Sequence, residues 1–221
     1  MQQKTFVRMS GLGGQGVVTA AHILGSAAVR SGFFSTVNPF FGAEKRLAPA
    51  ESYVRISSQP INERGEVLFP DIIMIMHPHV ITLGKSYTMP FFDGLQKKGK
   101  IIINSSESLS LVESEKMKLA ELEARVFYIS ATQVAVDVAG TDLSTNVAML
   151  GAFLAVTDFI SEKGLEEALI ERFGGAKFVA SGTTAALDDM LKSKFAKLTQ
   201  LIEKNMEVIM QAKAAVWEYA V

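Results

Sequence analysis

Short apolar segments alternate with longer segments of helical periodicity along most of the chain. Five runs are too short for helices and are bounded by turn residues, so they predict strands. One of them, DIIMIM at 71–76, is apolar almost without interruption, as is typical of a strand buried on both faces of a parallel sheet. The predicted strands are 6–9, 33–37, 71–76, 100–104 and 125–130. This alternation predicts an α/β protein with an open, mostly parallel sheet and flanking helices.

A sixth segment has a different pattern, because polar and apolar residues alternate in it. Residues 51–57 read ESYVRIS and follow a loop that contains Pro39, Gly42 and Pro49. A period of two predicts a strand with one face in the core and the other toward solvent.

The C-terminal half of the chain has helical patterns. Residues 145–160 are almost wholly apolar, which predicts a helix buried all round, and 165–173 predict a further helix. From 185 to 219 no Gly or Pro interrupts an apolar stripe, so one long helix is expected, about 50 Å long at ~1.5 Å per residue. We therefore expect an α/β domain at 1–180 and a helical extension at 181–221 that contacts a partner; the alternative is a helix broken into two pieces that fold back.

A glycine-rich turn separates the first predicted strand from the first helix. Gly11, Gly13, Gly14 and Gly16 precede an amphipathic segment at 17–29. Glycine reaches positive φ freely and has no Cβ, so the backbone N–H groups at the start of the helix can close around an anion. The positive end of the helix dipole favours the same ligand. The turn therefore predicts a site for a phosphate or pyrophosphate group.

The spacing of Gly11, Gly13 and Gly16 also satisfies G-x-G-x-x-G, the pattern of dinucleotide-binding units. Such a unit binds the NAD ribose through an Asp or Glu roughly 20 residues further on, at the end of its second strand. Here the second apolar run is followed by Asn38 and Pro39. NAD binding is therefore a weaker alternative, and glycines that only permit close packing of helix on strand are another.

Two basic residues follow the second predicted strand. Lys45 and Arg46 would lie at the same edge of a parallel sheet as the glycine turn, where they could add positive charge for a phosphate ligand. An ion pair with Glu44 or Glu51 that only fixes the loop is the alternative.

The sequence offers few groups for a complete active site. His77 and His79 could ligate a metal, but no third ligand has convincing spacing, so a role in the loop is favoured. The chain has 0 cysteines, which excludes a thiolate-ligated iron–sulfur cluster, a cysteine nucleophile and a disulfide within it. A binding module for a phosphate-bearing ligand fits these residues better than a self-contained enzyme.

Composition and charge narrow the class of protein further. A chain of 221 residues can bury one sizeable core. Its 22 basic and 23 acidic residues almost cancel, and no basic stretch predicts a nucleic-acid surface. No apolar run approaches the ~20 residues of a membrane span, and MQQKTF does not begin a signal peptide. We expect a cytoplasmic protein.

Several segments, in this order, resemble the gamma subunit, or gamma domain, of the 2-oxoacid:ferredoxin oxidoreductases, a family of anaerobic metabolism. The similarity covers roughly residues 4–175. The segments are SGLGGQGVVTAAHILGSAAVRSG, FGAEKRLAPAESYVRIS, the apolar strand at 71–76, INSSE at 103–107 and STNVAMLGAFLA at 144–155.

The resemblance implies a Rossmann-like unit that assembles with alpha, beta and delta subunits. It also implies that thiamine diphosphate, magnesium and [4Fe-4S] clusters are held by those partners, and that electrons leave to ferredoxin or another acceptor. For the glycine turn it implies binding of coenzyme A. The candidate contacts carried over on matching positions are Gly11, Gly13, Gly14, Gln15, Gly16, Lys45 and Arg46, with no catalytic and no metal-binding residue.

One position departs from the family pattern. Where the family commonly reads Gly-Gly after the arginine, this chain has Leu47 and Ala48, so two Cβ atoms stand beside the loop. The function expected is a non-catalytic subunit of a complex that oxidatively decarboxylates a 2-oxoacid, usually to an acyl-CoA. A single-chain NAD-dependent dehydrogenase and a purely structural subunit are the alternatives.

Overall fold

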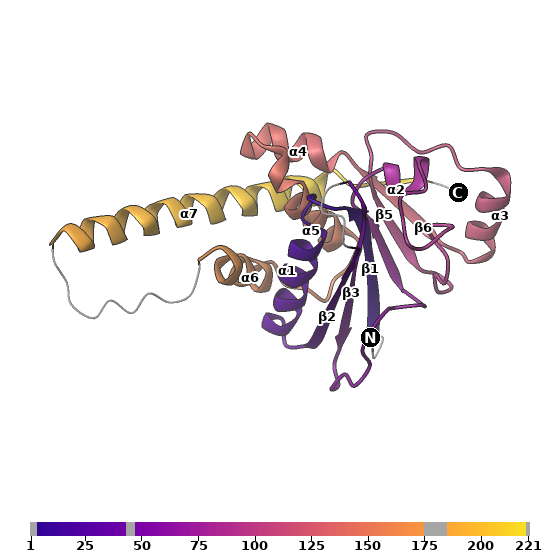
Figure 1. Cartoon of the computed structure of the whole chain (residues 1–221), viewed down its shortest axis with the longest axis horizontal. Helices are drawn as coiled ribbons and strands as arrows, with labels where there is room; N and C mark the ends of the chain where they lie inside the picture. Colours follow the sequence, from indigo (N-terminus) through magenta and orange to yellow (C-terminus); the bar gives the residue numbers. More distant parts are fainter. Residues whose placement is uncertain (1–3, 43–46, 175–184, 220–221) are drawn as a thin grey trace.

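One twisted sheet forms the centre of the molecule, and helices cover both of its faces (Figure 1). The computed structural model describes residues 4–42, 47–174 and 185–219, with 185–195 described by the backbone alone. The strands are β1 (Lys4–Leu12), β2 (Phe34–Phe41), β3 (Pro49–Ser57), β4 (Ile72–Ile75), β5 (Lys100–Asn104), β6 (Arg125–Ile129) and β7 (Trp217–Tyr219). The helices are α1 (Val17–Arg30), α2 (His79–Thr82), α3 (Glu113–Glu121), α4 (Ala131–Ala139), η1 (Asp142–Ser144), α5 (Thr145–Val156), α6 (Glu162–Gly174) and α7 (Ala185–Ala214).

The strand order in the described chain is β2-β3-β1-β4-β5-β6-β7. Strands β1, β4, β5 and β6 run parallel, and β2 points the same way because it pairs antiparallel with β3, itself antiparallel to β1. The short parallel strands are buried on both faces, which explains their apolar runs. The predicted α/β architecture is confirmed.

The two faces of the sheet have separate hydrophobic clusters. Alternate strand residues such as Met74 and Ile102 pack with α1, α4, α5, α6 and the C-terminal part of α7. The opposite residues, such as Ile75 and Ile103, pack with α2, α3 and the segment 91–95. The sheet is therefore the middle layer of three.

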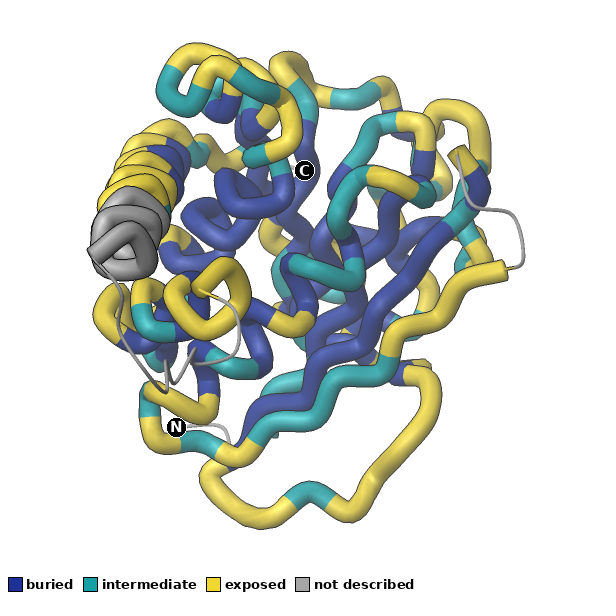
Figure 2. The backbone as a smooth tube through the Cα atoms, turned by 60° about the vertical axis from the view of Figure 1, so that its left-hand side comes forward, coloured by how far each residue is buried: buried dark blue, intermediate teal, exposed yellow. Residues whose placement is uncertain are grey.

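The prediction that one face of β3 points toward solvent is wrong. β3 lies between β2 and β1, and eight of its nine residues are buried; in Figure 2 it is dark blue, whereas the edge strand beside it is teal and yellow. Two of its charged side chains have hydrogen-bond partners within the protein: Arg55 donates to the carbonyl oxygens of Gly65 and Glu66, at 3.0 and 2.8 Å. Glu51 accepts hydrogen bonds from the hydroxyls of Tyr53 and Ser86, at 2.8 and 3.0 Å. Burial of these polar groups is tolerated because each is hydrogen-bonded.

The C-terminal segment differs from its prediction at its end. α7 is one unbroken helix, but it stops at Ala214, and the last described residues form β7, which pairs antiparallel with β6. Arg125 on β6 makes two hydrogen bonds of 2.8 and 2.7 Å to the carboxylate of Glu218. The ring of Tyr128 stacks on Trp217. The end of the chain is therefore part of the sheet.

The C-terminal part of α7 packs against the domain. Figure 1 shows its N-terminal part projecting beyond α6, and Figure 2 shows buried residues along one side of it. Ile202, Val208, Ile209 and Ala212 are buried in the larger cluster. Within the described residues, no helix is both long and apolar enough to span a bilayer.

Candidate functional site

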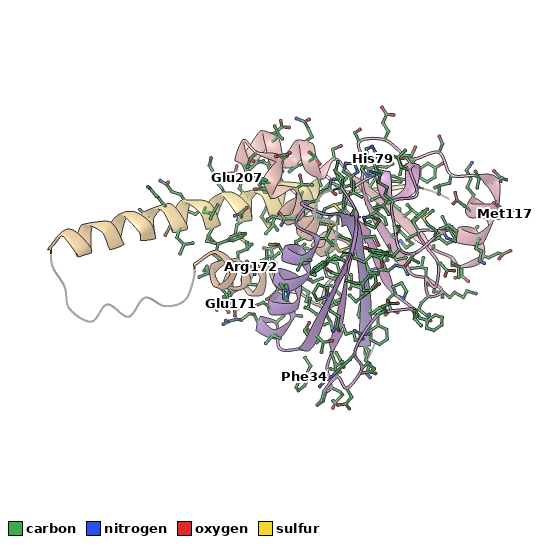
Figure 3. All side chains as sticks on the ribbon, viewed as in Figure 1. Phe34, His79, Met117, Glu171, Arg172 and Glu207 are labelled. Carbon is green, nitrogen blue, oxygen red and sulfur yellow. The ribbon has the colours of Figure 1, made fainter. Side chains whose placement is uncertain are left out.

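The carboxyl ends of β1 and β4 meet at a point where the chain leaves the sheet in opposite directions. After β1 it passes through α1 to β2 on one side, and after β4 it continues to β5 on the other. Ligands of open α/β sheets bind in the crevice at such a switch point. Figure 3 shows His79, just after β4, at this edge and Phe34, at the start of β2, at the opposite edge.

The glycine turn lies at this edge, between the end of β1 and the start of α1. Gly14 and Gly16 have φ angles of 93° and 72°, which a residue with a Cβ adopts only with strain. The hydrogen bond from the Ala20 N–H to the Gly16 carbonyl oxygen, 2.8 Å long, is the first of α1. The N–H groups of the first residues of the helix, 17–19, precede that bond and have no acceptor within the helix. They can bind an anion, as the sequence predicts.

Other predicted contacts have structural roles in the turn. A Cβ on Gly11 would lie 2.7 Å from Val17 Cγ2, so this glycine permits close packing of helix on strand. The Gly13 N–H donates to the Ala48 carbonyl oxygen at 2.8 Å. Gln15 closes the turn, because its Oε1 accepts from the Leu12 N–H at 3.1 Å. Gly11, Gly13 and Gln15 therefore shape the turn, and the backbone N–H groups at the start of α1 are the candidate anion contacts.

The loop after β2 lies directly on the glycine turn. Leu47 donates its N–H to the Gly13 carbonyl oxygen at 3.3 Å, and its φ is 57°. Glycine adopts this backbone conformation without strain. Lys45 and Arg46 lie outside the described residues, so their place near the turn stays a prediction.

Replacing Leu47 by glycine is expected to stabilise the protein. The side chain is 61% exposed, so little packing is lost, while about 1–2 kcal/mol of left-handed strain is removed against about 0.5–1 kcal/mol of added chain entropy. Thermal unfolding should show a gain of up to about 1 kcal/mol. Leu83→Gly is the matched control: Leu83 is 60% exposed with φ −118°, so the same change should destabilise. A loss at Leu47 equal to that at Leu83 would contradict the strain argument.

Polar side chains that the sequence analysis did not select complete the same edge. Asn104, at the end of β5, donates through Nδ2 to the Met76 carbonyl oxygen at 3.0 Å and to Thr132 Oγ1 at 3.1 Å. Thr145 Oγ1 lies 3.4 Å from Thr132 Oγ1. Asn146, in the first turn of α5, packs against Gly16. Two sequence segments could have pointed to these residues, INSSE at 103–107 and STN at 144–146. Each places polar residues where a strand or a loop leads into a helix.

The histidines after β4 interact with one another. His77 Nδ1 accepts from the His79 N–H at 3.1 Å, and the two rings meet edge to face. Burial, followed by the nearby His79 and Lys85, lowers the pKa of His77 below its ordinary value. At neutral pH His77 is therefore mostly neutral and helps to hold the loop. Among the described residues no group of three or more His, Cys, Asp or Glu side chains could hold a metal ion.

A hollow of about 870 Å³ lies at the opposite edge of the sheet, lined in part by Lys97, Lys98 and Lys100. These lysines are already engaged: Lys97 and Lys98 pair with Glu123, and the Lys100 ammonium donates to the Val156 carbonyl oxygen. The carboxyl edge, with open backbone donors, is therefore the better candidate site.

Comparison with known proteins agrees with this architecture. The family model described as pyruvate ferredoxin/flavodoxin oxidoreductase matches residues 6–188. The common gamma subunit of the pyruvate/ketoisovalerate oxidoreductases of Thermococcus kodakarensis is 34% identical over 170 residues, which are 77% of this chain and 87% of the relative.

Two solved structures share the fold. The pyruvate oxidoreductase subunit PORC of Thermotoga maritima superposes with a TM-score of 0.71 and 18% identity, over 99% of this chain and 100% of that one. The 2-oxoglutarate:ferredoxin oxidoreductase of Magnetococcus marinus, solved with 2-oxoglutarate, coenzyme A and succinyl-CoA bound, gives a TM-score of 0.69 and 19% identity. That match covers 97% of this chain and 31% of the other. The chain therefore belongs to the pyruvate ferredoxin/flavodoxin oxidoreductase family and aligns with its gamma subunits over most of their length.

Proposed function

We propose that this chain is the gamma subunit of a multisubunit 2-oxoacid:acceptor oxidoreductase and binds the phosphates of coenzyme A at the glycine turn. The observation that carries the ligand assignment is the set of backbone N–H groups at the start of α1, which open onto the switch point of the sheet. Support comes from the Magnetococcus marinus relative, whose structure contains coenzyme A. Lys45 and Arg46 add positive charge to the site in this proposal.

The topology favours coenzyme A over NAD. In a dinucleotide-binding unit the strand after the first helix lies parallel beside the first strand and presents the acid for the ribose. Here antiparallel β3 separates β2 from β1, and Asn38 and Pro39 stand near the end of β2. The described part of this chain therefore lacks, at the end of β2, the acidic ribose contact that a self-contained NAD-dependent dehydrogenase needs.

The remaining chemistry belongs to companion chains in this proposal. The complex decarboxylates a 2-oxoacid oxidatively, passes the acyl group to coenzyme A and delivers the electrons to ferredoxin or another acceptor. The [4Fe-4S] clusters are held by companion chains in this proposal, since this chain has 0 cysteines to ligate them. Thiamine diphosphate and magnesium are likewise assigned to the alpha, beta and delta subunits. In this proposal the part of α7 that projects beyond α6 is the partner-contacting surface of the segment 181–221 and contributes to assembly. The C-terminal part of α7 and β7 belong to the domain.

The first test of this function is purification through a tag on the chain in its native host. Cysteine-rich partner chains should copurify, and calorimetric titration of the complex should show binding of coenzyme A and none of NAD. If the complex bound neither coenzyme A nor NAD, the remaining hypothesis would be that this chain is a purely structural subunit. Substrate turnover by this chain without partners would overturn the proposal.

The basic loop is tested by Lys45→Ala. If the ammonium contacts a phosphate, the dissociation constant for coenzyme A should rise about tenfold. Lys116→Ala on α3 is the control, because Lys116 interacts with Glu113 on the same helix, away from the turn. Equal affinities of the two variants would show that Lys45 only fixes the loop.

A further inference from the structure

The sheet has a long, uncharged edge strand. β2 forms one border of the sheet, and within the described chain no strand pairs with its outer side (Figure 2). None of its eight residues carries a charge. Proteins usually protect an exposed edge with charges, prolines or a very short strand. The opposite border strand, β7, has three residues and pairs Glu218 with Arg125, whereas β2 has only Pro39. The outer side of β2 is therefore available to another strand.

The ladders of the sheet show which backbone groups of β2 face outward. On β1, the carbonyl oxygens of Phe6 and Ser10 accept hydrogen bonds from residues that flank β4, so the odd-numbered residues of β1 direct their backbone groups toward β3. Through the two antiparallel registers, the even-numbered residues of β2 then face β3. The N–H and C=O groups of Ser35 and Val37 therefore point away from the sheet. Pro39 has the same orientation, which is where an edge strand tolerates proline.

β2 has nearly the same pattern of residues in both directions from Val37. Phenylalanines stand three residues away on either side, at 34 and 40, and uncharged polar residues stand next to it, at 36 and 38. Phe34 and Phe40 are 50% and 40% exposed. Thr36 Oγ1 is shielded from solvent and has no hydrogen-bond partner among the described residues. A two-fold symmetric interface needs a surface that is complementary to itself, and this pattern meets that condition.

We propose that β2 pairs antiparallel with β2 of a second copy of this chain, about a two-fold axis at Val37, so that two sheets become one. In this register Phe34 lies opposite Phe40 of the second copy, and Thr36 lies opposite Asn38 of the second copy. Two aromatic pairs and two pairs of polar side chains then form on one face of the sheet, and such cross-strand pairs stabilise neighbouring strands. Since β2 is uncharged, no like charges oppose each other along it.

The other face of β2 has room for the second copy. A hollow of about 490 Å³ is lined by residues of α1, α6 and β2, among them Val29, Ser35 and Val37, and it leaves space beside the strand in which side chains of the second copy can pack. Along the backbone, the two copies of Val37 exchange two N–H···O=C hydrogen bonds, and each Ser35 N–H donates to the carbonyl oxygen of Pro39 of the second copy. No residue of the glycine turn takes part, so this inference does not depend on coenzyme A.

Disulfide formation in the full chain tests the pairing, because the chain has 0 cysteines and an introduced thiol can pair only with its own copy. Opposite residues of an antiparallel pair have Cα atoms about 5.5 Å apart, within the range of a disulfide. Oxidised glutathione should therefore convert Val37→Cys into a covalent dimer, with the two thiols oxidised and two molecules of glutathione released in the reduced form. Electrophoresis without reductant should show a product of twice the 24.0 kDa mass.

Ser35→Cys is the matched control on the same face of the same strand. In the proposed register the two copies of residue 35 lie four residues apart along the strands, about 14 Å, so they cannot form the bond. The cross-linked fraction should therefore be at least about tenfold greater for Val37→Cys. The same oxidation of the complex purified through this chain should give the same product.

Charges at the aromatic pairs test the register independently. Phe34→Lys/Phe40→Lys places like charges opposite each other twice, whereas Phe34→Glu/Phe40→Lys places opposite charges there, with the same loss of aromatic surface. In sedimentation equilibrium of the full chain the wild type should be a dimer, and the dissociation constant of the first variant should exceed that of the second about tenfold. Within one copy the two positions lie about 20 Å apart, so repulsion inside a copy does not explain such a difference.

Each other result overturns the inference. A wild-type chain that stays a monomer, or cross-linking of Ser35→Cys as strong as that of Val37→Cys, refutes the pairing about Val37. Equal dissociation of the two charge variants would mean that a dimer uses another surface. A product that forms in the isolated chain but not in the complex would assign the edge of β2 to a companion subunit. Failure of the complex to bind coenzyme A would refute the proposed function and leave this inference standing.

Discussion

Gly16→Ala is expected to lower the free energy of unfolding by about 2–5 kcal/mol and to abolish measurable binding of coenzyme A. Two costs add. The φ of 72° carries about 1–2 kcal/mol of strain for a residue with a Cβ, and that Cβ would lie 2.6 Å from Asn146 Nδ2 and 3.2 Å from its Cβ. Relief requires the Asn146 amide to leave its present position and its Cβ to move a few tenths of an ångström away from the turn. Chemical denaturation and calorimetric titration measure the two effects.

Gly14→Ala is the matched control in the same turn. Its φ is 93°, but nothing lies within 4 Å of an added Cβ. The free energy of unfolding should therefore fall only by the backbone strain that alanine adds, about 1–2 kcal/mol. The double variant Gly16→Ala/Asn146→Ala isolates the collision, because the smaller side chain leaves room. Its stability should return toward that of Gly14→Ala. Strict additivity of the two single variants would show that Gly16 and Asn146 do not press on each other.

Gly151→Ala is expected to cost about 3 kcal/mol of stability, although alanine is the better helix former by about 1 kcal/mol. A Cβ on Gly151 would lie 2.3 Å from the Ile209 carbonyl oxygen and 2.9 Å from Ala212 Cβ. Both are on α7, and a backbone oxygen cannot move unless the helix moves. Hydrogen exchange should show faster exchange along the C-terminal part of α7 while the strands of the sheet stay protected.

Ala155→Ser, on the exposed side of the same helix, is the control for Gly151→Ala. It also adds one heavy atom to α5, but toward solvent, so it should change stability by less than about 0.5 kcal/mol. An equal loss in both variants would mean that α5 tolerates no enlargement anywhere, and the close approach of α5 and α7 would then explain nothing.

Local patterns predicted most of the architecture because they reflect burial along single elements. The run at 71–76 is apolar because β4 has a layer on each side. The segment 145–156 is largely apolar because every residue of α5 except Thr145 and Ala155 is buried. β3 was misjudged because Arg55 and Glu51 have partners outside the strand, in the loop that follows it and in the segment after α2, which the pattern within the strand does not encode. The strand at 217–219 was missed because no Gly or Pro separates it from α7.

The candidate site was predictable only in part, for a similar reason. Glycines in a short interval between strand and helix indicate a turn with open N–H groups by local stereochemistry alone. The contact of Asn146 with Gly16 depends on the packing of α5 against α1, which no local pattern encodes. A lone Asn at a helix start indicates a cap, and only the fold shows that its amide faces Gly16.

The pairing of β7 with β6 has a practical consequence for work with fragments. A version cut after α7 would expose the outer backbone N–H and C=O groups of β6 and leave Arg125 without Glu218. An unpaired sheet edge can pair with a strand of another molecule, so such shortened chains would be prone to aggregate. A polypeptide fused to the C-terminus would follow the edge strand β7 directly. A spacer between β7 and the fused segment therefore protects the native pairing of β7 with β6.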